Sequence, residues 1–338
     1  MREKAMEAVR RYAAMDPSSW HTGLSDAGAR RALREACELL LASRLAHAQL
    51  PHGAHAPKEL LIWCAGNVFT APLEWVALFH ALGSRVTLKA PTGQAEPLHA
   101  LAAAFGEKVR VVEANHEAAL ALLSQADAVL AFGSTETMEA LNVQIPLDTP
   151  RSLHGHRVSF AVVDHLSSAE GIALDAALYD GQGCMSPAAV FCTTEAEKFA
   201  EKLAMELMKI ERELPRGPLD PALGPEWRRR AGLARSQGRL WSGESWAVGL
   251  APMAFATLSA LPRFIMVHPI QSLDQLAALR SLPLSTCATD RHDLGALSAA
   301  GFWRLCRPGH MQLPPPGRPH DGVDVRAVLC RAVSLETR

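Results

Sequence analysis

Residues 60–72 read LLIWCAGNVFTAP, and this stretch sets the pattern for the first half of the chain. Residues 60–64 form an apolar run with the length of a buried strand. A loop of small and polar residues follows, and Pro72 is well placed for the first turn of a helix. Because a strand that leads through a short loop into a helix is the repeating unit of a parallel sheet, the stretch predicts an α/β fold.

The same unit recurs as far as residue 164. Further apolar runs predicted as strands lie at residues 85–90, 109–113, 127–132 and 158–164. Helix-like stretches lie at residues 72–82, 95–105, 116–124 and 135–143. We expect one parallel sheet with helices on both faces. Ligands bind such sheets at the carboxyl ends of the strands, so the loops after the strands are the first places to look for a site.

The size and composition of the chain exclude several functional classes. A chain of 338 residues is too long for one simple core, which predicts two domains. The net charge is −1 and basic runs are absent from the sequence, so we expect no nucleic-acid partner. The sequence has no apolar stretch near the roughly 20 residues of a membrane span, and its N-terminus lacks the apolar core of a signal peptide.

Cysteine usage indicates a reducing compartment. The seven cysteines form an odd set without CxxC spacing, which argues against a disulfide framework and against a zinc site. We therefore expect no metal and a cytoplasmic location. One cysteine, Cys184, lies in the stretch LYDGQGCMSPAAVFC at residues 178–192. Gly181 and Gly183 allow a sharp bend and close approach of a ligand, which is typical of a nucleophilic thiol. A small buried hydrophobe is the alternative, and the pattern leaves both open.

Two polar residues follow the first strands. Asn67 comes after the first strand, and its side-chain amide can face a developing oxyanion, a contact worth roughly 3 kcal/mol in acyl transfer. A plain turn or cap is the commoner role of an isolated asparagine. Lys89 ends the second apolar run and suits a phosphate or ribose contact. A lysine that extends to the surface is the alternative.

The loop after the fourth strand reads GSTE at residues 133–136. Gly133 and Ser134 lie where backbone N–H groups at a helix N-terminus can bind an anion. A capping box without any ligand explains the same pattern, and both interpretations stay open. The sequence contains neither GxGxxG nor GxxxxGK[ST], so the usual nucleotide fingerprints are absent from it.

Taken together, these motifs resemble the aldehyde dehydrogenase superfamily, and more narrowly its LuxC-like acyl-CoA reductase branch. The superfamily resemblance rests on GNV at 66–68, Lys89, GSTE at 133–136 and GQGC at 181–184. The narrower one adds HGHRVSF at 154–160, QGCMSP at 182–187, GFWR at 301–304, PGHM at 308–311 and HDG at 320–322. The resemblance runs from about residue 60 to the C-terminus. It implies an aldehyde-dehydrogenase-like fold, with a Rossmann-type parallel-sheet cofactor domain and a smaller α/β catalytic domain.

The resemblance also implies roles for matched residues. Cys184 would be the nucleophile, and Asn67 with the Cys184 backbone N–H would form the oxyanion hole. Lys89 would contact the adenosine ribose of a nicotinamide cofactor, while Gly133 and Ser134 would lie at the pyrophosphate. Many relatives that prefer NAD carry a glutamate where this chain has Thr92. An uncharged residue there does not repel a 2′-phosphate, which favours NADPH, with NADH as the alternative cofactor.

The second half of the chain completes the expected organisation. Residues 195–214 have an amphipathic helix pattern, and residues 246–250 and 264–268 read as strands. Residues 285–289 and 296–307 are expected to return to the first domain, and residues 325–333 to form a final helix. The resulting division is a helical support segment at 1–59, a cofactor-binding domain at 60–178, a catalytic domain at 179–290, and a C-terminal return and oligomer-contact segment at 291–338.

One departure from the superfamily bears on the reaction. Oxidative aldehyde dehydrogenases use the glutamate of a Glu-Leu-Gly-Gly motif to activate water, whereas residues 153–156 here read LHGH. Without that base an acyl-enzyme resists hydrolysis and can be reduced instead. The resemblance therefore implies NADPH-dependent reduction of an acyl-CoA or acyl-carrier-protein thioester to an aldehyde, through an acyl-cysteine. His154 and His156 can hold a proton or be plain surface residues, and both roles stay open.

Other functions remain as alternatives. They are an NAD(P)-dependent aldehyde dehydrogenase, an acyl-phosphate reductase, and a non-catalytic subunit that binds a partner. The resemblance further implies a homodimer or a larger homo-oligomer, with contacts from the tail and from residues 147–156. The chain is shorter than LuxC-like relatives, which have a longer N-terminal region, and the acyl group is not identified by the sequence.

Overall fold

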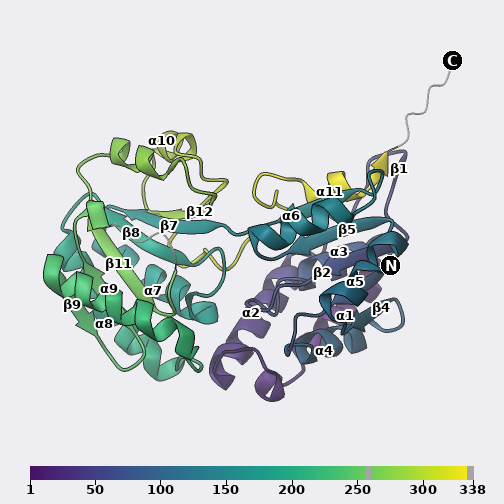
Figure 1. The fold of residues 1–338 in the computed structure, drawn as a ribbon, viewed down its shortest axis with the longest axis horizontal. Coiled ribbons are helices and arrows are strands. Elements are labelled where there is room, and N and C mark those ends of the chain that lie inside the picture. Colours follow the sequence, from purple (N-terminus) through teal and green to yellow (C-terminus); the bar gives the residue numbers. More distant parts are fainter. Residues whose placement is uncertain (256–259, 333–338) are drawn as a thin grey trace. The chain divides into compact units, whose positions relative to one another are not determined.

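The computed structural model describes residues 1–255 and 260–332. The chain folds into two compact units (Figure 1). The first unit consists of Met1–Thr22, Ala32–His156 and Pro315–Arg338, and the second consists of Gly23–Arg31 and Arg157–Pro314. The division into four functional segments concerns the roles of those segments, and it stays a prediction.

A parallel sheet forms the centre of the first unit. Within the described residues it has five strands in the order β4-β3-β2-β5-β6. Their bounds are β2 (Glu59–Trp63), β3 (Arg85–Lys89), β4 (Val109–Val112), β5 (Ala128–Phe132) and β6 (Arg151–His154). The chain moves outward from β2 in one direction and then starts again beside it with β5, so the topological switch point lies between β2 and β5. The parallel α/β sheet predicted from the sequence is thereby confirmed.

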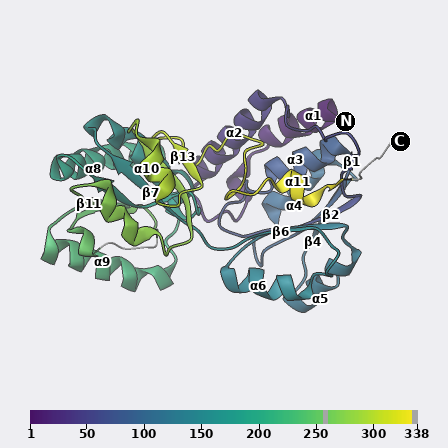
Figure 2. The same cartoon turned by 90° about the horizontal axis from the view of Figure 1, so that it is seen from above.

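Helices cover both faces of this sheet, as Figure 2 shows. One layer contains α1 (Arg2–Ala13), α3 (Leu73–Leu82) and α4 (Glu96–Phe105). The other contains α5 (His116–Leu120) and α6 (Thr135–Gln144), whose Met138 and Leu141 pack on Trp63 and Val129 of the strands. The helix α2 (Asp26–Ser43) contributes its residues from Ala32 onward to this unit.

The C-terminal segment completes the first unit. Its helix α11 (Val325–Leu329) begins after Asp324, whose carboxylate accepts the Ala327 N–H at 3.0 Å, and it buries Val325 and Leu329. The strand β14 (Arg331–Ala332) then pairs antiparallel with β1 (Ala54–His55). The predicted final helix is therefore shorter than expected, and residue 333 lies outside the described residues.

A second sheet forms the centre of the second unit. Its seven strands, counted over the described residues, have the order β13-β12-β7-β8-β11-β10-β9. Their bounds are β7 (Val158–Val163), β8 (Pro187–Cys192), β9 (Arg239–Ser242), β10 (Ala247–Leu250), β11 (Phe264–Pro269), β12 (Leu284–Thr289) and β13 (Arg304–Cys306). Neighbouring strands are parallel except for the antiparallel pair β9 and β10. Every residue of β7 and β8 is buried, as expected for strands covered on both faces.

Two layers of helices cover the second sheet. The apolar faces of α7 (Ala169–Ala177) and α8 (Ala196–Glu213) pack on one side. The helices α9 (Gly224–Gln237) and α10 (Leu294–Ala299) pack on the other side.

Short 3₁₀ helices occur in both units. They are η1 (Pro17–Ser19), η2 (Leu123–Gln125), η3 (Leu166–Ser168), η4 (Leu178–Gly181), η5 (Pro221–Leu223), η6 (Met253–Phe255) and η7 (Leu273–Leu279).

Two placements expected from the sequence are wrong. Residues 158–164 were expected in the sheet that follows residue 60, but β7 lies in the second sheet between β8 and β12. Residues 285–289 and 296–307 were expected to return to the first domain, yet β12 and β13 extend the second sheet. The cause is the same in both cases. An apolar run shows that a strand is buried, but its periodicity does not show which strands lie beside it.

Candidate active site

The loops at the switch point of the first unit begin at the same edge of the sheet. Trp63 pairs with Lys89 of β3 on one side and with Ala131 of β5 on the other. The loop after β2 carries Gly66 and the exposed Asn67. A Cβ added to Gly66 would lie 2.5 Å from Gln94 Oε1, so the loops after β2 and β3 approach closely at this glycine.

A small pocket lies between these two loops and the starts of α3 and α4. Its cavity volume is only about 10 Å³, which is room for about one water molecule. Its lining is mostly apolar and consists of Ala65, Gly66, Phe69, Pro72, Pro91, Gln94, Pro97 and Leu98. Gln94 supplies the one side-chain amide among these residues.

Lys89 is a buried cation in the first unit. Its exposed fraction is 8%, and its ammonium group lies 4.9 Å from the centroid of the Trp63 ring. That arrangement is a cation–π contact. Desolvation by burial lowers the pKa of Lys89. The lysine therefore does not extend to the surface. Thr92, three residues later, is exposed in the turn that follows β3.

Ser134 is the N-cap of α6. Its hydroxyl oxygen accepts the Thr137 N–H at 3.2 Å. Ser134 therefore caps the helix, which is the alternative role that the sequence allowed. Gly133 lies directly before it, where an added Cβ would be 3.1 Å from Met138 Cε. Hydrogen bonds from its own backbone and from Ser134 lower the pKa of Glu136, which places a negative charge in the first turn. This charge opposes a bound anion, while the helix N-terminus favours one.

Cys184 lies in the second unit, in the loop between η4 and β8. The loop is a tight turn, in which the Ser186 N–H donates to the Gly183 carbonyl oxygen at 2.9 Å. The Cys184 carbonyl oxygen accepts the Ser159 hydroxyl at 2.7 Å, and Ser159 Oγ accepts the Thr286 N–H at 3.1 Å. The cysteine backbone is thus tied to two strands of the sheet, and the residue is half-buried.

The approach to this loop is strained. Tyr179, Asp180 and Gly181 have consecutive positive φ angles of 59°, 51° and 70°. Such angles disfavour non-glycine residues and persist only where the surroundings enforce them. Here Arg263 does so, because its Nε donates to the buried Asp180 carboxylate at 2.7 Å. The Gly217 N–H donates to the other carboxylate oxygen at 2.9 Å.

The other six cysteines are poor nucleophiles. All seven lie within the described residues and are free thiols. Burial raises the pKa of Cys37, Cys64 and Cys306 to about 12, and that of Cys330 to about 11. Burial also raises the pKa of Cys192 and Cys287. A thiol reacts as its thiolate, so these six side chains are inert near neutral pH.

A polar network that the sequence reasoning missed supports the cysteine loop. The carboxylate of Asp175, at the end of α7, accepts the N–H groups of Gly309 and Met311 at 2.7 and 2.8 Å. Burial raises the pKa of Asp175 to about 7. The Gln312 amide then donates to Ser186 Oγ at 2.6 Å, two residues beyond the cysteine. The PGHM motif at 308–311 marks one side of this network, but nothing in the sequence singled out Asp175.

Comparisons with known proteins agree with these observations. The family model described as acyl-CoA reductase (LuxC) matches residues 99–332, more than half of the chain. The chain belongs to the acyl-CoA reductase (LuxC) family. The resemblance seen in the sequence is confirmed, and the candidate residues Gly133, Ser134 and Cys184 lie inside the matched range. No curated protein matches the sequence.

Solved structures with the same fold are aldehyde dehydrogenases and related enzymes. An NAD-dependent benzaldehyde dehydrogenase from Corynebacterium glutamicum has 15% identity and a TM-score of 0.69, over 93% of this chain and 83% of that one. An aldehyde dehydrogenase from Brucella melitensis biovar abortus 2308 has 15% identity and a TM-score of 0.75, over 99% and 86%. An NADP-dependent enzyme from E. coli has 16% identity and a TM-score of 0.75, over 98% and 86%.

The low identities show the fold alone, and that fold is the predicted aldehyde-dehydrogenase-like one. Family and fold together support an oxidoreductase of the aldehyde dehydrogenase and LuxC type. The candidate residues Asn67, Lys89, Thr92, Gly133 and Ser134 belong to the first unit, and Cys184 belongs to the second. Among the described helices, none has both the length and the apolar character that a bilayer span requires.

Proposed function

We propose that this LuxC-family protein reduces an acyl thioester, either an acyl-CoA or an acyl-carrier-protein thioester, to an aldehyde with NADPH. The reaction runs through an acyl group on Cys184. The observation that carries this proposal is the setting of that cysteine. It is half-buried on a turn whose backbone is tied to β7 and β12 through Ser159.

The first half-reaction is a thioester exchange at Cys184. The thiolate sulfur attacks the thioester carbonyl carbon, a new C–S bond forms, and the C–S bond to CoA or to the carrier breaks. The departing thiol takes up one proton, and no electrons change hands in this step. The hydrogen bond from Ser159 to the Cys184 carbonyl oxygen fixes the backbone of the nucleophile during the attack. Asn67 and the Cys184 N–H are the proposed donors to the oxyanion.

The second half-reaction needs an acyl-enzyme that survives long enough to be reduced. Residues 153–156, LHGH, supply no carboxylate to activate water at the place where oxidative relatives have a glutamate. His154 is buried and its Nε2 lies 2.8 Å from Ser152 Oγ, so this histidine is not an exposed base either. Slow hydrolysis of the acyl-cysteine follows, which favours reduction over release of an acid.

The first unit fits a nicotinamide dinucleotide. The close approach of the loops at Gly66 lies at the carboxyl edge of the sheet, where folds of this kind bind ligands. Lys89 supplies a buried ammonium group for ribose hydroxyls, and Thr92 places no negative charge in the turn after β3. These features favour NADPH. The negative charge of Glu136, in the first turn of α6, opposes the binding of an anion there. When bound, the cofactor supplies the hydride for the reduction.

The proposal extends to assembly and location. Val143 and Leu147, around the end of α6, are 82% and 86% exposed. Large apolar side chains at such exposure favour a protein contact. Leu147 begins the stretch 147–156, for which the family resemblance implies a dimer contact, and Val143 lies four residues before it. A homodimer or larger homo-oligomer in the cytoplasm is therefore part of the proposal. Light scattering of the wild type and of a Val143→Ser/Leu147→Ser variant tests the contact, which is rejected if the two have the same mass.

Intact-protein mass spectrometry tests the chemistry directly. The protein is incubated with a panel of acyl-CoAs without a nicotinamide, and the wild type is expected to gain the mass of one acyl group. The Cys184→Ser variant should lack the thioester adduct, and the matched control Cys306→Ser should retain it, because that thiol is half-buried with a raised pKa. An adduct that persists in Cys184→Ser overturns the assignment. Acylation by acyl phosphates alone overturns the thioester substrate.

A further inference from the structure

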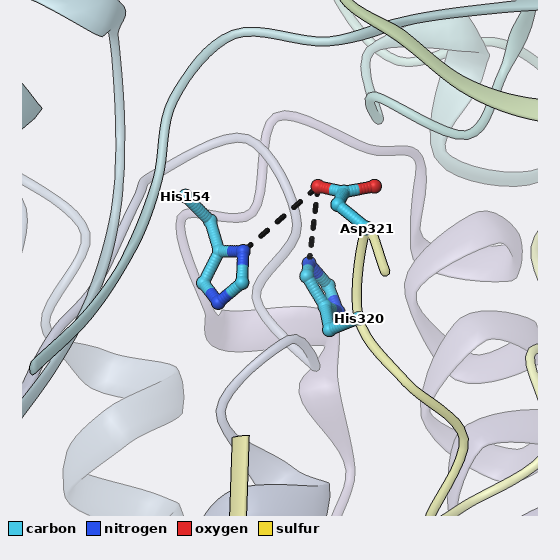
Figure 3. A group of neighbouring side chains, drawn as sticks. All are labelled: His154, His320 and Asp321. Atoms are coloured by element: carbon cyan, nitrogen blue, oxygen red, sulfur yellow. Dashed lines mark ion pairs between the residues drawn. The ribbon is translucent and has the colours of Figure 1, made fainter. Parts of the chain in front are cut away.

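Three potential metal ligands meet in the first unit, within the part of the chain that the structure describes. They are His154, His320 and Asp321, whose ligand atoms all lie within 4.8 Å of one another. Figure 3 shows both imidazole rings beside the Asp321 carboxylate. His154 Nδ1 lies 3.9 Å and His320 Nε2 3.8 Å from Asp321 Oδ2. The side chains are 5%, 13% and 7% exposed, so the cluster is shielded from water.

The fold holds these residues in place although they are far apart in the sequence. His154 is the last residue of β6. His320 and Asp321 belong to a tight two-residue turn, in which the Val323 N–H donates to the His320 carbonyl oxygen and the His320 N–H to that of Val323, at 2.9 and 2.8 Å. Asp321 and Gly322 have φ angles of 47° and 82°, as the Asp-Gly pair of such a turn requires.

The spacing of the cluster suits a metal better than direct ion pairs. Separations of 3.8 and 3.9 Å are too long for hydrogen bonds. Tetrahedral zinc, with bonds of about 2.0–2.2 Å, places its ligand atoms about 3.4 Å apart. A shift of about half an ångström in each histidine would close the cluster around an ion. We propose that His154, His320 and Asp321 form a binding site for a divalent transition-metal ion such as Zn²⁺.

Neighbouring groups prepare His154 for this role. Ser152 Oγ lies 2.8 Å from His154 Nε2, and a hydroxyl can accept the proton of that nitrogen. His154 Nδ1 then presents a lone pair toward Asp321, as metal-binding histidines do when their second nitrogen is hydrogen-bonded. The ring of Phe132 stacks on His154 with centroids 5.4 Å apart. Trp75 contacts His320 edge-on at 6.1 Å. An aromatic wall of this kind restricts competing water.

The contact between Arg318 and His320 disfavours metal binding. Arg318 Nη2 lies 3.3 Å from His320 Nδ1, and arginine can only donate. The contact favours a proton on Nε2, the nitrogen that would bind the ion. Metal binding must therefore move that proton and release Arg318, which keeps its ion pair with Glu74 at 3.2 Å. In Arg318→Gln the amide oxygen can instead accept a proton from Nδ1, so this variant should bind zinc more tightly.

Isothermal titration of the full chain, stripped with a chelator and then titrated with ZnCl₂, tests the site. We expect one ion per chain and a rise in melting temperature on binding, because metal binding adds to the stability of the folded state. Asp321→Asn keeps a residue that accepts a positive φ but removes the charge, and it should weaken binding about a hundredfold. His156→Ala, an exposed histidine outside the cluster, should bind like the wild type.

Cobalt substitution separates this cluster from the thiols and does not depend on any variant folding. Co²⁺ in the wild type should give the visible absorption of a tetrahedral site without a thiolate charge-transfer band. Such a band, or the lack of saturable binding, overturns the proposal. Equal zinc affinity in the wild type and in folded Asp321→Asn overturns it as well. Zinc affinity that Arg318→Gln leaves unchanged contradicts coordination through His320 Nε2.

Discussion

The two sheets carry their candidate residues at opposite ends of the strands. In the first unit, Asn67, Thr92 and Ser134 all follow strands, at the carboxyl edge of a parallel sheet. In the second unit, Cys184 comes before β8, at the amino end of a strand that is parallel to both neighbours. A pocket at the carboxyl edge of the second sheet, beside Thr289 and Arg291, does not include Cys184.

This difference shows that the rule of ligand binding at the carboxyl ends of parallel strands applies to the first sheet but does not locate Cys184 in the second. Binding at the carboxyl ends of strands is a consequence of loop and helix geometry in open parallel sheets, and it locates the candidate cofactor residues. The proposed nucleophile, Cys184, is positioned in a different way. Its position depends on a strained turn held by the buried pair of Asp180 and Arg263, and on the hydrogen bond from Ser159 to the Cys184 carbonyl oxygen. Four substitutions test whether the first unit holds the proposed cofactor residues and the second unit the proposed nucleophile.

The largest effect is expected for Cys184, which lies at the amino end of β8. Cys184→Ala should lower kcat for acyl-CoA reduction by about 10⁴-fold or more, because no covalent acyl-enzyme can form. The affinity for NADPH, measured by fluorescence titration, should stay unchanged, since the proposed cofactor residues belong to the first unit. Cys306→Ala is the matched control and should keep full activity. Activity retained in Cys184→Ala rejects the covalent route.

Arg263→Leu tests the support of the strained turn. Arg263 is 1% exposed and Asp180 3%, so the change leaves a buried carboxylate unpaired, and we expect a loss of about 3–5 kcal/mol in the free energy of unfolding. Urea denaturation measures it. Arg239→Leu breaks an exposed ion pair with Glu197 and should cost less than about 1 kcal/mol. Equal losses in the two variants contradict a supporting role for the buried pair.

Asn67→Ala tests the carboxyl edge of the first sheet. Loss of one oxyanion donor should lower kcat by about a hundredfold with little change in KM. Asn115 offers a control, because it follows β4 in the same sheet and its side chain caps α5 by accepting the Ala118 N–H at 2.8 Å. Asn115→Ala should cost about 1 kcal/mol of stability and leave kcat intact. A kcat that Asn67→Ala does not change removes this residue from the site.

The smallest effect is expected from Thr92→Glu. A new carboxylate in the exposed turn after β3 should repel a 2′-phosphate and raise KM for NADPH about fivefold to tenfold, as exposed charges interact weakly. KM for NADH should stay the same or fall. Thr92→Ser adds no charge and serves as the control. Equal changes for both cofactors contradict the proposed reason for NADPH preference.

The sequence predicts the local elements well and their neighbours poorly. Residues 158–164 and 285–289 were recognised as strands because apolar runs of that length are buried, but their membership of the second sheet depends on pairing partners distant in sequence. For Lys89 the sequence allowed a phosphate or ribose contact or an extension to the surface, and the packing of its ammonium group against Trp63 argues against the second. His154 and Asp321 share no motif spacing, so their meeting is visible in three dimensions alone.

The return of the chain to the first unit has a consequence for synthesis on the ribosome. All residues of the second unit have been translated by Pro314, whereas the first unit still lacks α11 and the strand β14 that pairs with β1. Domains tend to fold as units while the chain emerges. The unit that carries Cys184 can therefore mature first, and the unit proposed to hold the nucleotide is completed only after residues 315–332 have emerged.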